Sequence, residues 1–317
     1  MSFAPSRLLI FGATGAIGKY ITEAVLAAKP AFSHVSIFTS TNTATTKPEL
    51  LSRWKASGVP LSVVVGDVTS ADDVANAYKS EKPDTVISAL GRGALHVQTK
   101  LVELAEASES VKWLFPSEYG TDIEHNAKSP NEKPHQNKLA LRKYIRENVK
   151  KLHVTYLVTG PYFDMWVASP SDPKLGRFDA ANKQAYVIED GEGKIGFCTM
   201  LDVGKFLVAA LRHPQESFGK ALKVQSFVVT PNEVVAEYEK QTGGDKWQVT
   251  KVPLAELKAL EEKAWADAIP TATPYTLRRI WAEGGTLYEK NDNELIGIGP
   301  NDTDSLATAV GRALASN

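Results

Sequence analysis

The feature that most constrains this chain is a glycine-rich turn between a predicted strand and a predicted helix, near the start of the sequence. Residues 7–18 read RLLIFGATGAIG, so an apolar run ends at three glycines spaced G-x-x-G-x-x-G. Ile17, Ile21 and Val25 then recur at helical spacing. A strand, a glycine turn and a helix in this order form the phosphate-binding turn of dinucleotide-binding α/β folds.

Each glycine has a separate purpose in such a turn. Gly12 permits the tight turn, Gly15 lets the backbone approach a pyrophosphate, and Gly18 lets the helix pack closely on the sheet. The helix N-terminus adds unpaired N–H groups and a positive dipole end. The residues expected to contact a dinucleotide here are Gly12, Thr14, Gly15, Ala16, Ile17 and Gly18.

A mononucleotide P-loop is the nearest competing motif, because Gly18-Lys19 resembles its end. That motif requires glycine at the position of Ala13 and serine or threonine at the position of Tyr20, so it does not match. Any α/β protein also needs glycine at its first strand-to-helix turn. The position and flanks of this turn nevertheless favour a dinucleotide site.

Composition limits the class of protein. The chain has 317 residues, enough for one large α/β domain or for a nucleotide domain with a smaller companion. A formal net charge of −1 gives no sign of nucleic-acid binding. Cys198 is the single cysteine, which excludes an intramolecular disulfide and a cysteine-based zinc site, and no metal is expected. No apolar run approaches the length of a membrane span, so we expect a cytoplasmic protein without membrane contact.

Strand and helix patterns alternate as far as residue 160. The expected strands are 8–11, 35–38, 61–65, 85–90, 111–115 and 154–158. The expected helices between them are 48–57, 71–79, 97–107 and 136–149. This alternation predicts an α/β fold with a Rossmann-type doubly wound parallel sheet and a cofactor across the carboxyl ends of the strands. We therefore expect an NADP-binding domain over residues 1–160, for the cofactor reasons given below.

The pattern changes after residue 160, where prolines and shorter elements predict a smaller substrate-binding lobe, mainly over residues 161–317. Its expected strands are 185–188 and 195–198, and its expected helices are 232–241 and 254–268. Residues 201–212 have the pattern of an amphipathic helix and are expected to pack back on the first domain. The two parts are therefore expected to be interleaved around one cleft.

Residues after the second predicted strand bear on which dinucleotide binds. An NAD site usually has an acidic residue about 20 positions past the turn, but here Thr39 and Ser40 stand there, with Lys47 and Arg53 following. Hydroxyls and a nearby cation suit a 2′-phosphate, so NADP(H) is favoured, although a single basic residue most often lies on a solvated helix face. Asp67 either reaches the adenine or caps the next turn. Backbone contact with the cofactor is also expected at Ala89, Leu90 and Gly91.

Most short-chain dehydrogenases use a Tyr-x-x-x-Lys pair, in which the tyrosine is the acid and the lysine lowers its pKa. We expect this pair to be missing here. Either another residue then performs the acid–base chemistry, or the cofactor site is a sensor without chemistry.

A second motif resembles a known family. Residues 115–122 read FPSEYGTD, similar to the Pro-Ser-Glu-Phe-Gly signature of isoflavone reductase-like enzymes. These include phenylcoumaran benzylic ether and pinoresinol–lariciresinol reductases, in the NmrA-like branch of atypical short-chain dehydrogenases. The glycine turn also matches, and Lys138 stands before residues 141–145 as the family's catalytic lysine stands before its Ile-Arg-Arg segment. The resemblance covers nearly the whole chain, but this chain lacks the family's frequent arginine near Ser40 and has Gly160-Pro161 where the family has asparagine.

The resemblance implies roles for individual residues. Lys138 would bind the nicotinamide ribose and stabilise or protonate an oxygen that becomes anionic as hydride arrives. Ser117 and Glu118 would position the backbone and cofactor, while Tyr119 and His135 are reserve acids that equally suit structural roles. The cofactor contacts expected after the sixth strand are Gly160, Pro161, Tyr162 and Phe163.

Aromatic and flexible apolar residues near this strand suggest a flat substrate. Together with Tyr119, the residues expected to line its pocket are Phe163, Met165, Trp166 and Phe178. They would serve equally well as lobe core. The leading hypothesis is an NADPH-dependent reductase of an aromatic or polyketide-like molecule, monomeric or homodimeric. The alternatives are an NADP-sensing regulator without catalysis and a cofactor-retaining isomerase or cyclase.

Overall fold

Six parallel strands form the central sheet, in the order β3-β2-β1-β4-β5-β6. The structure is a computed structural model that describes residues 3–168, 172–269 and 272–316. The strands of the sheet are β1 (Arg7–Phe11), β2 (His34–Thr39), β3 (Leu61–Val65), β4 (Thr85–Ser88), β5 (Trp113–Phe115) and β6 (His153–Val154). This order changes direction between β1 and β4, as in a doubly wound fold. The predicted α/β class is confirmed.

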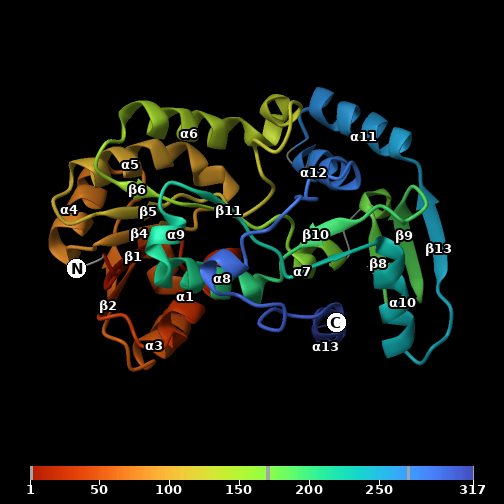
Figure 1. The fold of residues 1–317 in the computed structure, drawn as a ribbon, viewed down its shortest axis with the longest axis horizontal. Coiled ribbons are helices and arrows are strands. Elements are labelled where there is room, and N and C mark those ends of the chain that lie inside the picture. Colours follow the sequence, from red (N-terminus) through yellow and green to blue (C-terminus); the bar gives the residue numbers. More distant parts are fainter. Residues whose placement is uncertain (1–2, 169–171, 270–271, 317) are drawn as a thin grey trace.

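Helices cover both faces of the sheet (Figure 1). They are α1 (Ala16–Ala27), α2 (Thr41–Thr46), α3 (Pro48–Lys55), α4 (Ala71–Glu81), α5 (Gln98–Ala107), α6 (Gln136–Asn148), α8 (Met200–Arg212) and α9 (Pro214–Ser217). One face packs against α1, α3 and α8, and the opposite face against α4, α5 and α6. The apolar stripe of α8 lies against α1, because Val203, Phe206 and Leu207 are fully buried in that cluster.

The tract expected to be one strand over residues 154–158 is divided in two. β6 ends at Val154, and β7 (Tyr156–Val158) pairs instead with β11 (Ala221–Lys223). Between them, the Thr155 hydroxyl donates to the carbonyl of Ser217 at 2.6 Å and accepts from the Trp113 indole at 2.9 Å. These buried hydrogen bonds hold the segment where the chain leaves the central sheet.

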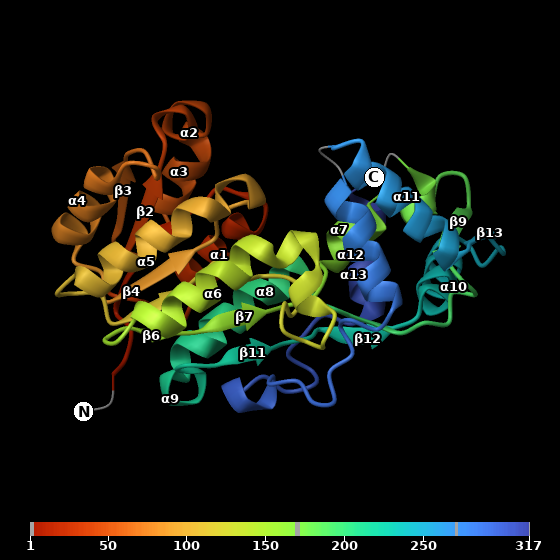
Figure 2. The same ribbon diagram turned by 90° about the horizontal axis from the view of Figure 1, so that it is seen from above.

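The second half of the chain builds a smaller lobe beside the sheet (Figure 2). Its strands are β8 (Arg177–Asp179), β9 (Gln184–Ile188), β10 (Ile195–Phe197), β12 (Phe227–Val229) and β13 (Gln248–Val252). Its helices are α7 (Phe163–Val167), α10 (Pro231–Gln241), α11 (Leu254–Ala266), α12 (Ala272–Ala282) and α13 (Leu306–Ala315). Short 3₁₀ turns are η1 (Arg92–Val97), η2 (Ser129–Asn131), η3 (Lys133–His135), η4 (Pro173–Leu175) and η5 (Glu294–Ile296). A separate aromatic cluster forms the core of this lobe.

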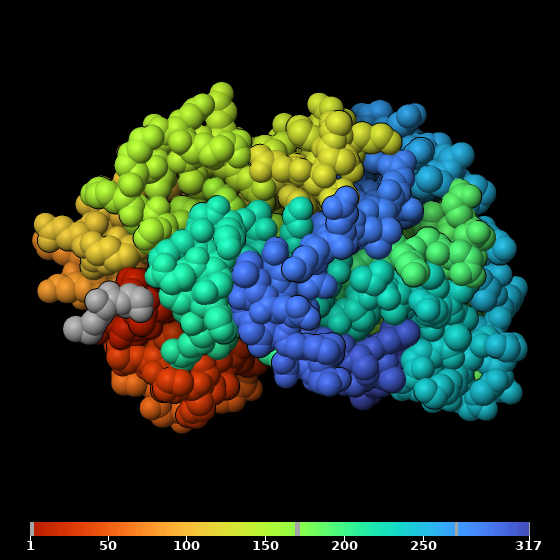
Figure 3. Space-filling model, in the orientation of Figure 1, coloured from red at the N-terminus to blue at the C-terminus, as the bar shows by residue number. Residues whose placement is uncertain are grey.

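Side chains tie the lobe to the sheet side of the molecule. The Trp281 indole donates to the Thr121 hydroxyl at 2.9 Å, and Arg279 pairs with Glu132 at 2.6 Å. In the space-filling view, the last part of the chain (blue) runs across the front of both parts (Figure 3). No helix within residues 3–168, 172–269 and 272–316 is long and apolar enough to cross a membrane.

Candidate functional site

The glycine turn leaves the N-terminus of α1 open. Gly12 has a φ of +73°, and a Cβ placed there would lie 2.5 Å from the carbonyl oxygen of Ala89. A Cβ on Gly18 would overlap the carbonyl of Gly12. Ala16 and Ile17 are the first residues of α1, and Gly15 precedes them with no side chain capping the helix. The first N–H groups of α1 are therefore available to an anion.

A groove of 680 Å³ extends from this turn along the carboxyl ends of β1, β2 and β3. The predicted cofactor residues among those that line it are Gly12, Thr14, Thr39, Ser40, Asp67 and Leu90. The Lys47 ammonium reaches back to the turn and donates to the carbonyl of Thr14 at 2.9 Å. The Ser40 hydroxyl accepts from the N–H of Thr43 and caps α2. Hydroxyls and a cation thus lie around the end of β2.

Arg53, a basic residue after β2, and Asp67, a predicted cofactor contact, both interact with neighbouring residues of the protein. Arg53 pairs with Glu23 at 2.7 Å and is not among the residues that line the groove. Asp67 accepts from both the N–H and the hydroxyl of Thr69, each at 2.8 Å, which lowers the pKa of its carboxyl. The turn-capping alternative for Asp67 is therefore the one the hydrogen bonds support, although its side chain also lines the groove.

The end of β5 is joined to the end of β4 by Ser117. Its hydroxyl donates to the carbonyl of Leu90 at 2.8 Å, and its N–H donates to the Gln98 side chain at 2.7 Å. Ala89 is buried against β1, whereas Gly91 is exposed at the start of η1. Ser117 thus fixes the backbone between this groove and the cavity that Lys138 lines.

Lys138 is held by a buried ionic network. Its ammonium donates to the backbone carbonyl of Glu118, whose side chain receives two bonds from Arg142 at 3.0 and 3.1 Å. Glu118 and Arg142 are almost completely buried. Arg142 also donates to Glu124 at 2.8 Å, and these carboxylates raise its pKa. A two-bond guanidinium–carboxylate pair fixes orientation as well as charge, so the loop that positions Lys138 is rigidly anchored.

The surroundings of Lys138 favour proton donation near neutral pH. Burial of the ammonium against the loop lowers the pKa of Lys138 to about 8. The Glu118 carboxylate opposes this shift, and the cations of Arg92 and Arg142 add to it. A lysine with its pKa in this range is mostly protonated at neutral pH yet releases its proton readily.

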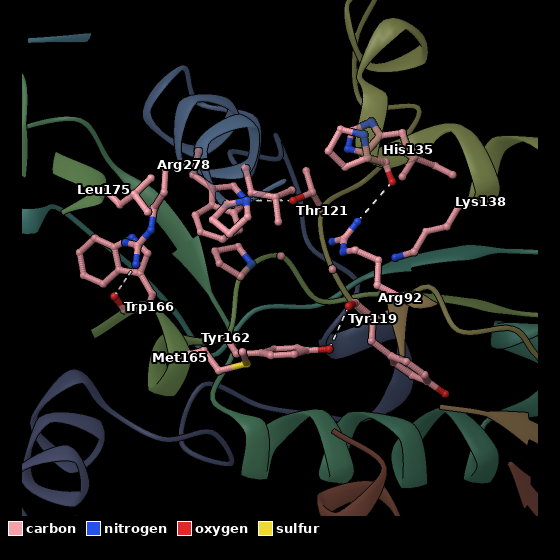
Figure 4. Close-up of a pocket in the computed structure, with 18 of the residues that line it drawn as sticks. Arg92, Tyr119, Thr121, His135, Lys138, Tyr162, Met165, Trp166, Leu175 and Arg278 are labelled. Carbon is pink, nitrogen blue, oxygen red and sulfur yellow. Dashed lines mark hydrogen bonds between the residues drawn. The ribbon is translucent and has the colours of Figure 1, made fainter. Parts of the chain in front are cut away.

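The reserve acids are less suited to this task. The Nδ1–H of His135 donates to the carbonyl of Ser129 at 2.8 Å, and burial lowers the pKa of His135, so its neutral ring has no proton on Nε2 to give. Burial raises the pKa of Tyr119, whose hydroxyl has no hydrogen-bond partner among the residues described. In Figure 4 its ring points away from the other labelled side chains.

The expectation that the chain lacks a Tyr-x-x-x-Lys pair is wrong, because Tyr78 and Lys82 have this spacing. Tyr78 is buried on α4 and donates to the carbonyl of Leu101, and Lys82 ends that helix in a left-handed conformation. Neither residue lines the groove or the cavity beside Lys138. The pair therefore has no catalytic placement.

Lys138 opens into a cavity of 460 Å³ between the sheet and the lobe (Figure 4). The predicted residues that line it are Tyr119, Lys138, Gly160, Pro161, Tyr162, Met165 and Trp166. The Tyr162 hydroxyl donates to the carbonyl of Tyr119 at 2.9 Å and closes one side. Most of the lining is apolar, as in sites for small organic molecules.

The prediction is wrong for Phe163 and Phe178, which do not line the cavity. Phe163 faces into the lobe core, where its ring contacts those of Phe197 and Phe227 at centroid distances of 5.6 and 5.3 Å. Phe178 packs behind Trp166, at 4.8 Å between ring centroids. The core alternative holds for these two residues.

Several lining residues could not be found by motif. Arg92, Pro134 and Leu175 come from short 3₁₀ turns, and α12 supplies Pro274, Leu277, Arg278 and Trp281. No sequence pattern links α12, which lies more than 100 positions from Lys138, to this cavity. Only the charge of Arg92 beside the predicted Gly91 contact was a usable signal.

The sheet order and the open helix terminus place the molecule in the Rossmann class of dinucleotide-binding folds. The chain belongs to the NmrA-like family, which matches residues 4–278.

Known proteins show the same relationship. The chain is 30% identical to an isoflavone reductase of Pisum sativum over 251 residues, 75% of this chain and 76% of the relative. It is 27% identical to a phenylcoumaran benzylic ether reductase of Pyrus communis over 242 residues, 75% of each. Its fold matches a leucoanthocyanidin reductase–NADPH complex of Vitis vinifera with a TM-score of 0.78 and 20% identity, over 98% of this chain and 100% of that one.

Proposed function

We propose that this protein is an NADPH-dependent reductase that transfers hydride to a conjugated or benzylic electrophilic carbon of an aromatic small molecule. The observation that carries the proposal is the position of Lys138, whose ammonium is fixed on the wall of an apolar cavity next to the dinucleotide groove. Leu90 lines the groove and Arg92 lines the cavity, so a single residue of the chain, Gly91, stands between a residue of each space. Its relatives include an isoflavone reductase and a phenylcoumaran benzylic ether reductase, which supports reductase activity.

The residues present fit NADP(H). A Cβ would fill the space beside Gly12, and without one the backbone and the start of α1 are open to the pyrophosphate. Thr39, Ser40 and Lys47 offer hydroxyls and a cation to a 2′-phosphate, and no carboxylate ends β2. The bound cofactor supplies the hydride.

Lys138 supplies the electrostatic part of the reaction. As hydride reaches the substrate carbon, negative charge collects on the conjugated or leaving oxygen. The ammonium stabilises that charge and donates a proton to the oxygen. Glu118 holds the ammonium through its backbone carbonyl, and Arg142 holds Glu118, so both act as positioning residues.

The proposal is tested by following NADPH consumption by absorbance with panels of enones, quinones and benzylic ethers. Turnover of at least one class, with the product reduced at the expected carbon, supports it. Tight binding of NADPH without turnover of any panel member would contradict it and would favour an NADP-sensing regulator.

The reaction rate should depend on the protonation of Lys138. Because the pKa of Lys138 is lowered to about 8, the ammonium is present below that pH and is lost as the pH rises through it. We expect kcat at saturating NADPH to fall as the pH rises through about 8. Lys138→Arg keeps the charge at higher pH and should remove this fall. A wild-type rate that is unchanged well above this pH would contradict the assignment.

Cofactor choice should depend on Lys47. Replacing it with glutamine removes one exposed cation from beside the turn, so we expect the KM for NADPH to rise by about fivefold with little change for NADH. The same substitution at Arg53, which pairs with Glu23, should leave both values unchanged. Equal effects on the two cofactors would show that Lys47 does not contact the 2′-phosphate.

A further inference from the structure

Arg278 is a buried cation with no counter-ion in the part of the chain that the structure describes. It is only 8% exposed and lines the cavity that contains Lys138. One of its terminal nitrogens, Nη2, donates to the carbonyl of Trp166 at 2.7 Å, whereas the other, Nη1, is buried and has no hydrogen-bond partner within residues 3–168, 172–269 and 272–316. Among the described residues Arg278 forms no ion pair, and burial alone lowers its pKa to about 9, so it remains charged at neutral pH.

An unpaired buried guanidinium is costly, because it has lost water and gained no anion in return. Trp166 and Trp281 lie against it, with ring centroids 5.2 and 5.7 Å from its central carbon. These cation–π contacts offset part of the cost but leave the Nη1 donor unused. An anionic ligand in the cavity that Arg278 lines would supply the missing counter-charge.

The cavity itself suits an anion. Its lining, as formed by the described residues, includes Arg92, Lys138 and Arg278 but no aspartate or glutamate. A second cavity of 230 Å³ lies on another side of Arg278, and its lining includes Glu189 and Asp190. These carboxylates would repel an anion there, so the anion site belongs to the first cavity.

The two ends of this cavity have different chemistry. Figure 4 shows Arg278 beside Trp166 and Leu175, at the opposite side from Lys138 and His135. The lining also includes apolar residues such as Met165 and Trp281. A substrate can therefore place its reacting oxygen at Lys138 and a second group at Arg278.

We propose that Arg278 binds a carboxylate of the substrate, so that the preferred substrates are aromatic acids rather than neutral aromatics. This inference rests on the proposed function in taking the cavity as the substrate site. A carboxylate stays ionised at neutral pH and matches the guanidinium in charge and geometry. Arg278 is thus a residue for substrate specificity, distant from the reacting atoms.

The test compares acids with their matched neutral esters by isothermal titration calorimetry in the presence of NADP⁺. The probes are benzoate, cinnamate and naphthoate, each with its methyl ester, so that three sizes of aromatic group are sampled. We expect at least one acid to bind wild-type protein about 10- to 100-fold tighter than its ester. Arg278→Met should abolish that preference, and Arg278→Lys should keep part of it. Lys263→Gln removes an exposed charge from the same lobe and is the control.

Each outcome decides the matter. A role for Arg278 in holding Trp166 alone would lower the melting temperature of Arg278→Met without changing the ratio of acid to ester affinity. Equal affinities for acid and ester, no binding of any acid below millimolar concentration, or a preference that survives in Arg278→Met would each overturn the proposal. The result is independent of turnover, because calorimetry with NADP⁺ measures binding alone, whereas the reductase assignment is decided by NADPH consumption with enones, quinones and benzylic ethers.

Discussion

Replacing Lys138 with methionine is expected to lower kcat by about 10²- to 10⁴-fold, the usual contribution of a positioned proton donor. Methionine has a similar length but no charge, so it cannot stabilise the oxygen that becomes anionic. The affinity for NADPH should change much less, because the glycine turn and the start of α1 are intact. Steady-state kinetics and a cofactor titration measure the two effects separately.

A matched control is available on the same helix. Lys143 on α6 is exposed, and its nearest acidic partner, Glu147, lies 4.0 Å away, so Lys143→Met should leave kcat unchanged. A Lys138→Met protein that keeps wild-type turnover would show that another group donates the proton. An equal loss of NADPH affinity and turnover would instead make Lys138 a cofactor-binding residue only.

Replacing Arg142 with methionine is expected to lower the free energy of unfolding by about 3–5 kcal/mol, because it leaves Glu118 buried without its partner. Denaturant unfolding measures this loss. Arg146→Met is the control: Arg146 lies one turn further along α6, pairs with Glu124 and is more than half exposed. Its loss should cost at most about 1 kcal/mol.

A double variant separates the charge from the packing. Glu118→Gln combined with Arg142→Met removes both charges, so we expect it to recover part of the stability lost in Arg142→Met. If Arg142→Met unfolds at the same denaturant concentration as the wild type, the buried pair does not anchor the loop. The placement of Lys138 would then need another cause.

The first half of the fold follows from local patterns. Each βα unit has a short apolar strand and an amphipathic helix, so alternation predicted the parallel sheet and its helices. The division between β6 and β7 was missed because residues 154–158 form one continuous apolar pattern around Thr155. Its cause is a pair of side-chain hydrogen bonds to distant residues, which no local pattern records.

The residues of the candidate site were also predicted only where they belong to local motifs. The glycine turn and Lys138 belong to short motifs, and the structure places both beside the expected spaces. Phe163 was assigned to the pocket because it is aromatic and follows the sixth strand, but in α7 it faces the lobe core while Met165 is 56% exposed. Arg278 was not anticipated, since its role depends on where α12 packs rather than on its neighbours in sequence.

The placement of Trp166 and Trp281 gives the cavity an optical reporter. Both indoles lie against Arg278 and line the space that a ligand would occupy. A bound anion would neutralise the guanidinium charge that faces each ring. An aromatic ligand would displace water from beside the two rings. The intrinsic fluorescence of the protein should therefore change when the cavity is filled, which allows libraries of compounds to be screened without labels before any product is known.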